Sequence, residues 1–404
     1  MKIDLKRKIK ASHAFMIIIV AAFFVGGGFV LYVKNIKYEE AVIVAPIVKK
    51  QHKIMGYDMI KRPKPSPVSM KKLKSQGCVA DGLLSEYNPE NDKFIALINR
   101  SNCYYLHRAI ETWLMPPDFE TVGYVMSQIE KRDVVYGMFI AEAIDFRANY
   151  LNELTGREFK FRDMCRKGSE NVWGEGSCKP TFSSKEYRNY IQYITQKAID
   201  AGVQSFTFGQ IYMQEGGRKD YAPKIVSEMR EYAEEKGVDI VIGAQTGSIT
   251  DEKYLKLFDY IEGGVGLSVD GSVENGPCFS GRGGCWALLW HEDFSSKAKN
   301  VLLHLDWTGI PSDDLDIFAR MDKEKRAQTL QYLYEKFSAK DMGFMMPYFG
   351  VIYKNNGGCY GPKKRFYSSD NAYSCQDENA INNILSGKNI NSAISESLSE
   401  KAGT

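Results

Sequence analysis

Residues 298–307, with the sequence AKNVLLHLDW, constrain the fold of this chain more than any other stretch. The apolar, branched run within it suits a strand covered on both faces, as in a parallel sheet under helices. With a period of two, Leu302, His304 and Asp306 share one face, which ends in a carboxylate beside the Trp307 indole. Strands of a (β/α)8 barrel carry chemistry at their C-terminal ends in this way. The alternative is an ordinary α/β strand whose aspartate caps the next element.

The rest of the chain supplies enough further strands for such a barrel. We predict eight strands, at residues 79–87, 104–112, 134–143, 203–211, 238–244, 259–262, 301–306 and 343–349. Amphipathic stretches lie between them, and the clearest helices are predicted at residues 185–201, 222–236 and 323–340. This alternation predicts an α/β fold, a (β/α)8 TIM-like barrel over residues 78–375. A doubly wound sheet is the alternative, although it would more often carry a glycine-rich dinucleotide loop.

The N-terminal part predicts a membrane anchor. Residues 14–33 carry no charge over a length that spans a bilayer as a helix. The basic flank at 1–13 predicts a cytoplasmic N-terminus, with the main domain periplasmic or extracellular. A cleaved signal peptide is the alternative, but its apolar region would be shorter. We predict a Pro- and Lys-rich stalk at 34–77 and a disordered tail at 376–404.

The eight cysteines all follow the uncharged segment, which is typical of disulfides in an oxidising compartment. Zinc is the alternative, but no C-x2-C spacing occurs. Eight cysteines allow 105 pairings, so the sequence alone does not fix the connectivity. Sequential pairing is favoured because each pair would close one local loop. The predicted pairs are Cys78 with Cys103, Cys165 with Cys178, Cys278 with Cys285, and Cys359 with Cys375.

Carboxylates recur at or just past the predicted C-terminal ends of strands. We predict catalytic roles for Asp306, Glu262, Glu142 and Glu215. Glycosidic-bond hydrolysis needs two carboxylates, one to protonate the leaving oxygen and one to attack or to activate water. Asp306 and Glu262 are the favoured pair, since their strands would be neighbours. For each residue alone, a helix cap or a solvated loop charge is the alternative.

Amides, a phenol, an imidazole and indoles on the same rim would suit sugar hydroxyls and sugar faces. The predicted substrate-binding residues are His304, Trp307, Gln210, Gln245, Tyr348 and Trp290. For the aromatic residues, core packing is the alternative. The net charge of +3 is spread along the chain and does not predict nucleic-acid binding. With five histidines and no H-x-H, HExxH, Walker or GxGxxG motif, we expect neither a metal nor a cofactor.

Over about residues 78–365 the chain resembles the (β/α)8-barrel glycoside hydrolases. The resemblance rests on the strand and helix pattern and on the rim carboxylates. Many such enzymes carry Asn-Glu after the fourth strand, where this chain has Gln214-Glu215. Asp306 stands where they have a glutamate at the end of the seventh strand.

The resemblance implies an enzyme that acts on a polysaccharide or a cell-surface glycan by carboxylate acid/base chemistry. Together with the N-terminal segment and the cysteines, it predicts a membrane-anchored, extracytoplasmic glycoside hydrolase. Two alternatives remain open from the sequence. One is a catalytically inactive barrel that binds glycans, and the other is a surface scaffold that contacts another protein.

Overall fold

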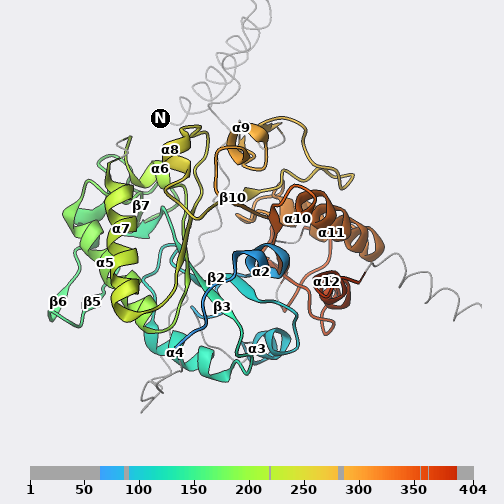
Figure 1. Ribbon diagram of the computed structural model, residues 1–404, viewed down its shortest axis with the longest axis horizontal. Coiled ribbons are helices and arrows are strands. Elements are labelled where there is room, and N and C mark those ends of the chain that lie inside the picture. The colour runs from blue at the N-terminus through green and yellow to red at the C-terminus, as the bar shows by residue number, and fades with distance from the viewer. Residues whose placement is uncertain are drawn as a thin grey trace, which may run out of the picture. The chain divides into compact units, whose positions relative to one another are not determined.

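The computed structural model describes residues 64–85, 91–217, 220–280, 286–354, 356–362 and 364–388. The predicted cytoplasmic flank and membrane anchor, and the first thirty residues of the predicted stalk, lie outside these ranges. Within them, no helix combines the length and the apolar character that crossing a membrane requires. The described residues form a mixed α/β fold around a large curled sheet (Figure 1).

The curled sheet is parallel except for its last strand. In spatial order its strands are β14 (Gly343–Phe344), β13 (Val301–His304), β10 (Tyr260–Gly264), β9 (Val241–Ala244), β8 (Ser205–Phe208), β3 (Val135–Ile140), β2 (Tyr105–Glu111), β1 (Gly77–Ala80), β15 (Met346–Val351) and the antiparallel β16 (Phe366–Ser368). The pairing registers place Leu303 opposite Phe344 and Cys78 opposite Met346. Only Met345 separates β14 from β15, so one chain segment pairs with β13 on one side and with β1 on the other.

Helices alternate with these strands along the chain. They are α2 (Met70–Ser75), α3 (Asn91–Asn99), α4 (Phe119–Gln128), α5 (Lys185–Asp200), α6 (Ile211–Gln214), α7 (Tyr221–Lys236), α8 (Glu252–Leu255), α9 (Glu292–Ser295), α10 (Asp314–Arg320), α11 (Lys323–Ser338) and α12 (Glu378–Leu385). Local signals fix their ends: Ser184 caps α5 by accepting from Tyr187 N, and Gly237 ends α7 at a φ of 61°.

Each of the eight predicted strands overlaps a strand of the curled sheet, and the three predicted helices correspond to α5, α7 and α11. The main differences for these elements lie at strand ends. The strand predicted at residues 301–306 ends at His304. The Asp306 N–H does not continue the sheet but donates to Asp314 Oδ2 at 3.3 Å, which turns the chain away. Asp306 therefore lies two residues past its strand.

Two segments predicted to lie outside the folded domain contribute helices to it. The last part of the predicted stalk forms α2, which buries Leu73 completely. The first part of the predicted tail forms α12, which buries Ile381 and Ile384. Apolar residues at helical spacing outweigh the polar composition of both segments.

Three of the four predicted disulfides are confirmed, namely Cys78–Cys103, Cys165–Cys178 and Cys359–Cys375. The fourth prediction involves Cys285, which lies outside the described residues. Cys165–Cys178 closes the insertion after β3, which also holds the short strand pairs β4 (Ile144–Asp145) with β7 (Ser177–Cys178) and β5 (Leu151–Asn152) with β6 (Arg157–Glu158).

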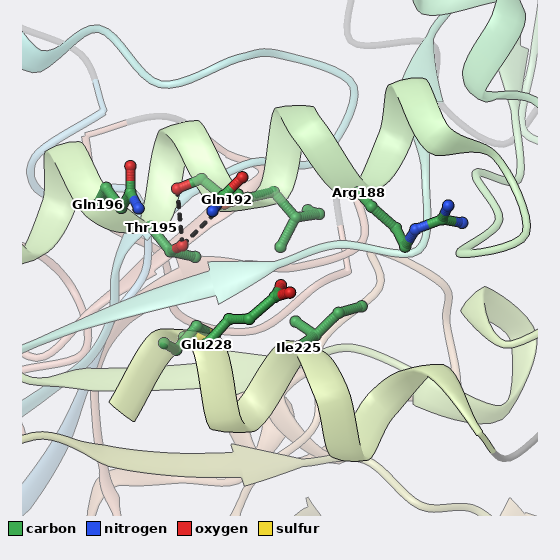
Figure 2. A pocket seen from close by; sticks show the side chains of 8 residues that line it. Arg188, Gln192, Thr195, Gln196, Ile225 and Glu228 are labelled. Carbon is green, nitrogen blue, oxygen red and sulfur yellow. Dashed lines mark hydrogen bonds between the residues drawn. The ribbon is translucent and has the colours of Figure 1, made fainter. Parts of the chain in front are cut away.

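Outside the sheet, α5 and α7 lie side by side (Figure 1). A small pocket between them is lined by residues that include Arg188, Ile225 and Glu228 (Figure 2). In its wall the Thr195 hydroxyl donates to the Ile191 carbonyl oxygen at 2.8 Å, a bond within α5. This pocket belongs to the helix layer and not to the strand ends.

A buried ion pair fixes α12 to α11, and its loss should be costly. Arg326 Nε lies 2.8 Å from Asp377 Oδ2, and the two side chains are 3% and 1% exposed. We expect Asp377→Asn to lower the free energy of unfolding by about 3–5 kcal/mol, because the arginine would stay buried without its counter-ion. Urea unfolding measures this. The matched control is Glu252→Gln in an exposed pair with Lys256, which should leave stability unchanged within error. Equal effects of the two variants would contradict this account.

Candidate functional site

The Glu262 carboxylate lies buried within the curled sheet, between side chains of three other strands. Its Oε2 lies 2.9 Å from His107 Nε2 of β2, and its Oε1 lies 3.6 Å from His304 Nε2 of β13. Gln245, directly after β9, donates its Nε2 hydrogen to Oε1 at 2.9 Å. Glu262 and His304 have no exposed side-chain surface, and 1% of the His107 side chain is exposed.

Burial alone would raise the pKa of the Glu262 carboxyl by penalising its charged form. His107 and His304 outweigh that effect and hold the pKa below its usual range. Burial lowers the pKa of His107, whereas Glu262 outweighs burial and raises the pKa of His304. Glu262 is therefore an anion at neutral pH that depends on imidazole partners.

A group of hydroxyls lies behind this cluster, deeper in the sheet. The Tyr105 oxygen lies 2.9 Å from His107 Nδ1 and accepts from Ser205 Oγ at 3.0 Å. The Tyr260 hydroxyl lies 2.7 Å from that of Thr207. A Cβ at Gly243 would come within 2.0 Å of the Tyr260 ring, so the tyrosine fits only against glycine. These contacts fix the position of His107 from its Nδ1 side.

The Glu142 carboxyl follows β3 and is 3% exposed. Its Oε1 accepts from Gln210 Nε2 at 2.5 Å, and its Oε2 has no hydrogen-bond partner among the described residues. A Cβ at Gly209 would lie 2.4 Å from Oε2, so glycine makes room for the carboxyl. The Tyr212 hydroxyl, on a side chain that reaches the surface, donates to Gln210 Oε1 at 2.7 Å. Hydrogen bonds through Gln210 and Tyr212 thus connect the buried Glu142 carboxyl to the protein surface.

Burial raises the pKa of Glu142 to about 7, and the Arg108 charge and the Gln210 hydrogen bond only partly oppose it. A chain of amides connects this carboxyl to Glu262, because Gln210 N also donates to Gln245 Oε1 at 3.3 Å. The four groups lie at the ends of β3, β8, β9 and within β10. One carboxyl near neutrality and one anion therefore share a hydrogen-bonded rim.

Arg108 brings further charges to the same end of the sheet. Its guanidinium lies 3.8 Å from the centre of the Phe139 ring and 4.5 Å from that of Trp307. It donates to Glu111, and its Nε lies 3.8 Å from Asp81 Oδ1. Burial raises the pKa of Asp81 to about 7, against the charge of Arg108.

The loop after β13 is held by its own aspartates. Asp306 Oδ1 accepts from Trp307 N at 3.0 Å, and Asp306 is 7% exposed. Asp313, and not Asp306, caps the backbone at Thr308. Its Oδ2 accepts hydrogen bonds from both Thr308 N and Thr308 Oγ1. The local capping role that the sequence offered as the alternative for Asp306 thus belongs largely to Asp313.

Three of the predicted site residues have partners away from the Glu262 cluster. Glu215 accepts from Ala222 N of α7 and from the Tyr254 hydroxyl of α8. The Tyr348 hydroxyl donates to Asn382 of α12 at 2.9 Å, and Trp290 Nε1 donates to the Val265 carbonyl oxygen at 3.0 Å.

Of the predicted site residues, the structure brings together Glu142, Gln210, Gln245, Glu262 and His304, and the ring centres of Trp307 and His304 lie 5.0 Å apart in an edge-to-face arrangement. Trp307 is 4% exposed and already contacts Arg108. The sequence prediction missed His107, Arg108 and Asp81. The signal for His107 was its place in the strand predicted at residues 104–112, one of three histidines outside the N-terminal region.

Comparisons with known proteins give no match to a family model or to a curated protein. Solved structures match at low identity. A GH113 β-1,4-mannanase is 11% identical, with a TM-score of 0.45, over 77% of this chain and 97% of that chain. A cyclic α-maltosyl-(1→6)-maltose hydrolase from Arthrobacter globiformis is 12% identical, with a TM-score of 0.45, over 80% and 76%. A GH27 β-L-arabinopyranosidase from Geobacillus stearothermophilus is 12% identical, with a TM-score of 0.31, over 50% and 53%.

The raised pKa of Glu142 should appear in the pH dependence of stability. Below about pH 4.5 the carboxyl is protonated in both the folded and the unfolded chain, and it has no effect. As the pH rises toward about 7, the unfolded state ionises first, so the folded state loses stability. We expect the unfolding free energy of Glu142→Gln, relative to wild type, to rise by about 3 kcal/mol between pH 4.5 and 8.

Urea unfolding at several pH values measures this difference. The control is Glu335→Gln on the exposed face of α11, where a surface substitution should change stability little. A difference between Glu142→Gln and wild type that stays constant with pH would mean that the Glu142 pKa is not raised.

Proposed function

We propose that this chain is a membrane-anchored, extracytoplasmic enzyme that hydrolyses glycosidic bonds in a polysaccharide or cell-surface glycan. In this proposal the curled sheet is a (β/α)8 barrel closed through β14 and β15, and its C-terminal end is the active site. The enzymes of such barrels place their catalytic groups at this end.

The observation that carries the proposal is Glu142. It is a buried carboxyl whose pKa is raised to about 7, with one oxygen that has no partner among the described residues. A carboxyl that keeps its proton near neutral pH is what the departure of a sugar oxygen requires from a general acid. Gly209 makes room for the buried Oε2, while Oε1 accepts from Gln210.

Asp306 is the second carboxylate in this proposal. Counted around the strand order, β13 lies four strands from β3 in both directions, so Asp306 and Glu142 follow strands on opposite sides of the ring. The Arg108 guanidinium contacts both Phe139 of β3 and Trp307, which follows Asp306. Because one side chain reaches both, these contacts support a short distance across the ring between the end of β3 and the loop after β13. A glycosidase needs two carboxyl groups that face each other across such a space.

The rim also offers partners for sugar hydroxyls. Gln210, Gln245 and Tyr212 carry amide and phenol groups, and all three side chains are at least partly exposed. Trp113 and Trp173 pack edge to face with ring centres 5.3 Å apart and are both partly exposed. Partly exposed indoles are suited to stacking against a sugar ring.

The proposed compartment rests on the disulfides and on the sequence. Three disulfides in the described residues favour an oxidising environment outside the cytoplasm. The uncharged stretch at residues 14–33 supplies the anchor, with the N-terminus in the cytoplasm.

The test is hydrolysis of a polysaccharide panel by the full chain in detergent, measured as new reducing ends. For a substrate that is cleaved, we expect Glu142→Gln and Asp306→Asn each to lower kcat by about 10²–10⁴-fold while glycan binding persists. Glu335→Gln serves as the surface control. Activity should also fall as the pH rises above about 7, because Glu142 then loses its proton.

Three outcomes would contradict parts of this proposal. Unchanged activity in both variants would exclude this pair of carboxylates. Glycan binding by the wild type without release of reducing ends would show a catalytically inactive glycan-binding protein. Neither binding nor cleavage across the panel would favour the scaffold role.

A further inference from the structure

We propose that His107, Glu262 and His304 bind a divalent transition-metal ion, for which Zn²⁺ is the test case. This site does not depend on the proposed hydrolysis, because neither Glu142 nor Asp306 is one of its ligands. It does assign Glu262 to metal binding in place of acid/base chemistry.

The geometry of the three ligand groups fits one ion. Their ligand atoms all lie within 4.8 Å of one another. Glu262 Oε2 lies 2.9 Å from His107 Nε2, and Oε1 lies 3.6 Å from His304 Nε2. Two ligands of a tetrahedral zinc ion with bonds of about 2.0–2.1 Å lie about 3.3 Å apart, between these two values. Two imidazoles and one carboxylate form a recurrent ligand set for zinc and for non-haem iron.

Several buried polar atoms of the cluster have no hydrogen bond to a described residue, although three of them take part in the ion pairs given above. These atoms are His107 Nε2, Glu262 Oε2, His304 Nδ1 and His304 Nε2. Buried polar groups rarely remain unsatisfied, and a shared ion is one of the few ways to satisfy several at once. All three side chains are at least nine-tenths buried and come from different strands.

Neighbouring side chains hold two of the proposed ligands, His107 and Glu262, in orientations suited to metal binding. The Tyr105 oxygen lies 2.9 Å from His107 Nδ1 and can accept its hydrogen, which leaves Nε2 free for an ion. Gln245 donates to Glu262 Oε1 at 2.9 Å and so orients the carboxylate. Hydrogen bonds of this kind, behind the ligands, fix the imidazole tautomer and the ring orientation.

Arg108 is the nearby positive charge that would oppose a cation. Its guanidinium donates to Glu111, and its Nε lies 3.8 Å from Asp81, so carboxylates offset much of its charge. A second group with ligand-type atoms, Cys359, Cys375 and Asp377, is not available, because the cysteines are bonded to each other and the aspartate pairs with Arg326.

The experiment measures metal content and metal affinity of the full chain, purified in detergent with an affinity tag that lacks histidine. One sample is prepared without chelator from cells grown with added zinc. A second is stripped with chelator and titrated with Zn²⁺ or with Co²⁺, whose visible spectrum reports the ligands. We expect one ion per chain and a higher midpoint of thermal unfolding with metal.

Variants locate the ion. His107→Ala and His304→Ala should each weaken binding by more than the 10–100-fold expected for Tyr105→Phe, which removes only a supporting hydrogen-bond partner. His291→Ala is the matched control, because His291 lies at the start of α9 near Asp293 and should bind as wild type. Glu142→Gln should also bind metal as wild type, which separates this proposal from the hydrolytic one.

The proposal is overturned if the wild type carries no metal in either preparation, or if His107→Ala and His304→Ala bind as tightly as wild type. If the alanine variants do not fold, the wild-type stoichiometry, the Co²⁺ spectrum and Tyr105→Phe still decide it. A wild-type spectrum that indicates sulfur ligands, or a Tyr105→Phe affinity equal to wild type, would then count against it.

Discussion

The Glu262 anion, at zero side-chain exposure inside a curled parallel sheet, is the constraint on which the site depends. An isolated charge in such a place is prohibitively unfavourable, so compensating groups must come from other strands. His107, Gln245 and His304 supply them from β2, from the end of β9 and from β13. His107 and Gln245 are 138 positions apart in the chain, and Gln245 and His304 are 59 positions apart. The cluster therefore exists only if the strands are in register.

Burial raises the pKa of both Glu142 and Glu262, but their surroundings oppose it to different extents. At Glu142 a backbone hydrogen bond, the Arg108 charge and the Gln210 amide do not offset burial, and the pKa rises to about 7. At Glu262 two imidazoles more than offset it, and the pKa falls. The imidazole partners that reach Glu262 but not Glu142 thus decide the difference in protonation, although both groups are almost equally buried.

Much of the fold was predictable from sequence, because strands covered on both faces read as short apolar runs and helices carry their own caps. The strand predicted at residues 301–306 was in the right place but two residues too long. The side chain that ends it, Asp314, lies outside the strand, so the strand's own sequence does not reveal where it stops. α2 and α12 were missed because their few buried residues lie in polar segments. Glu215 and Tyr348 have side chains of the types expected at the rim of the sheet, and they lie close to it in the sequence. Their hydrogen-bond partners nevertheless lie on helices. Side-chain direction at the end of a strand depends on neighbours that the local sequence does not contain.

His107 shows the limit of motif reading most clearly. A metal motif such as HExxH places its ligands on one helix, so it is visible in a short window. Here the candidate ligands come from three strands, and no spacing in the sequence connects them. The expectation of a metal-free protein followed from the absence of local motifs, and that argument does not apply to ligands brought together by a sheet. A curled parallel sheet directs side chains from every strand toward one axis. Histidines and carboxylates on inward-facing positions of any such strand are therefore candidates to be tested together, however far apart they lie in the chain.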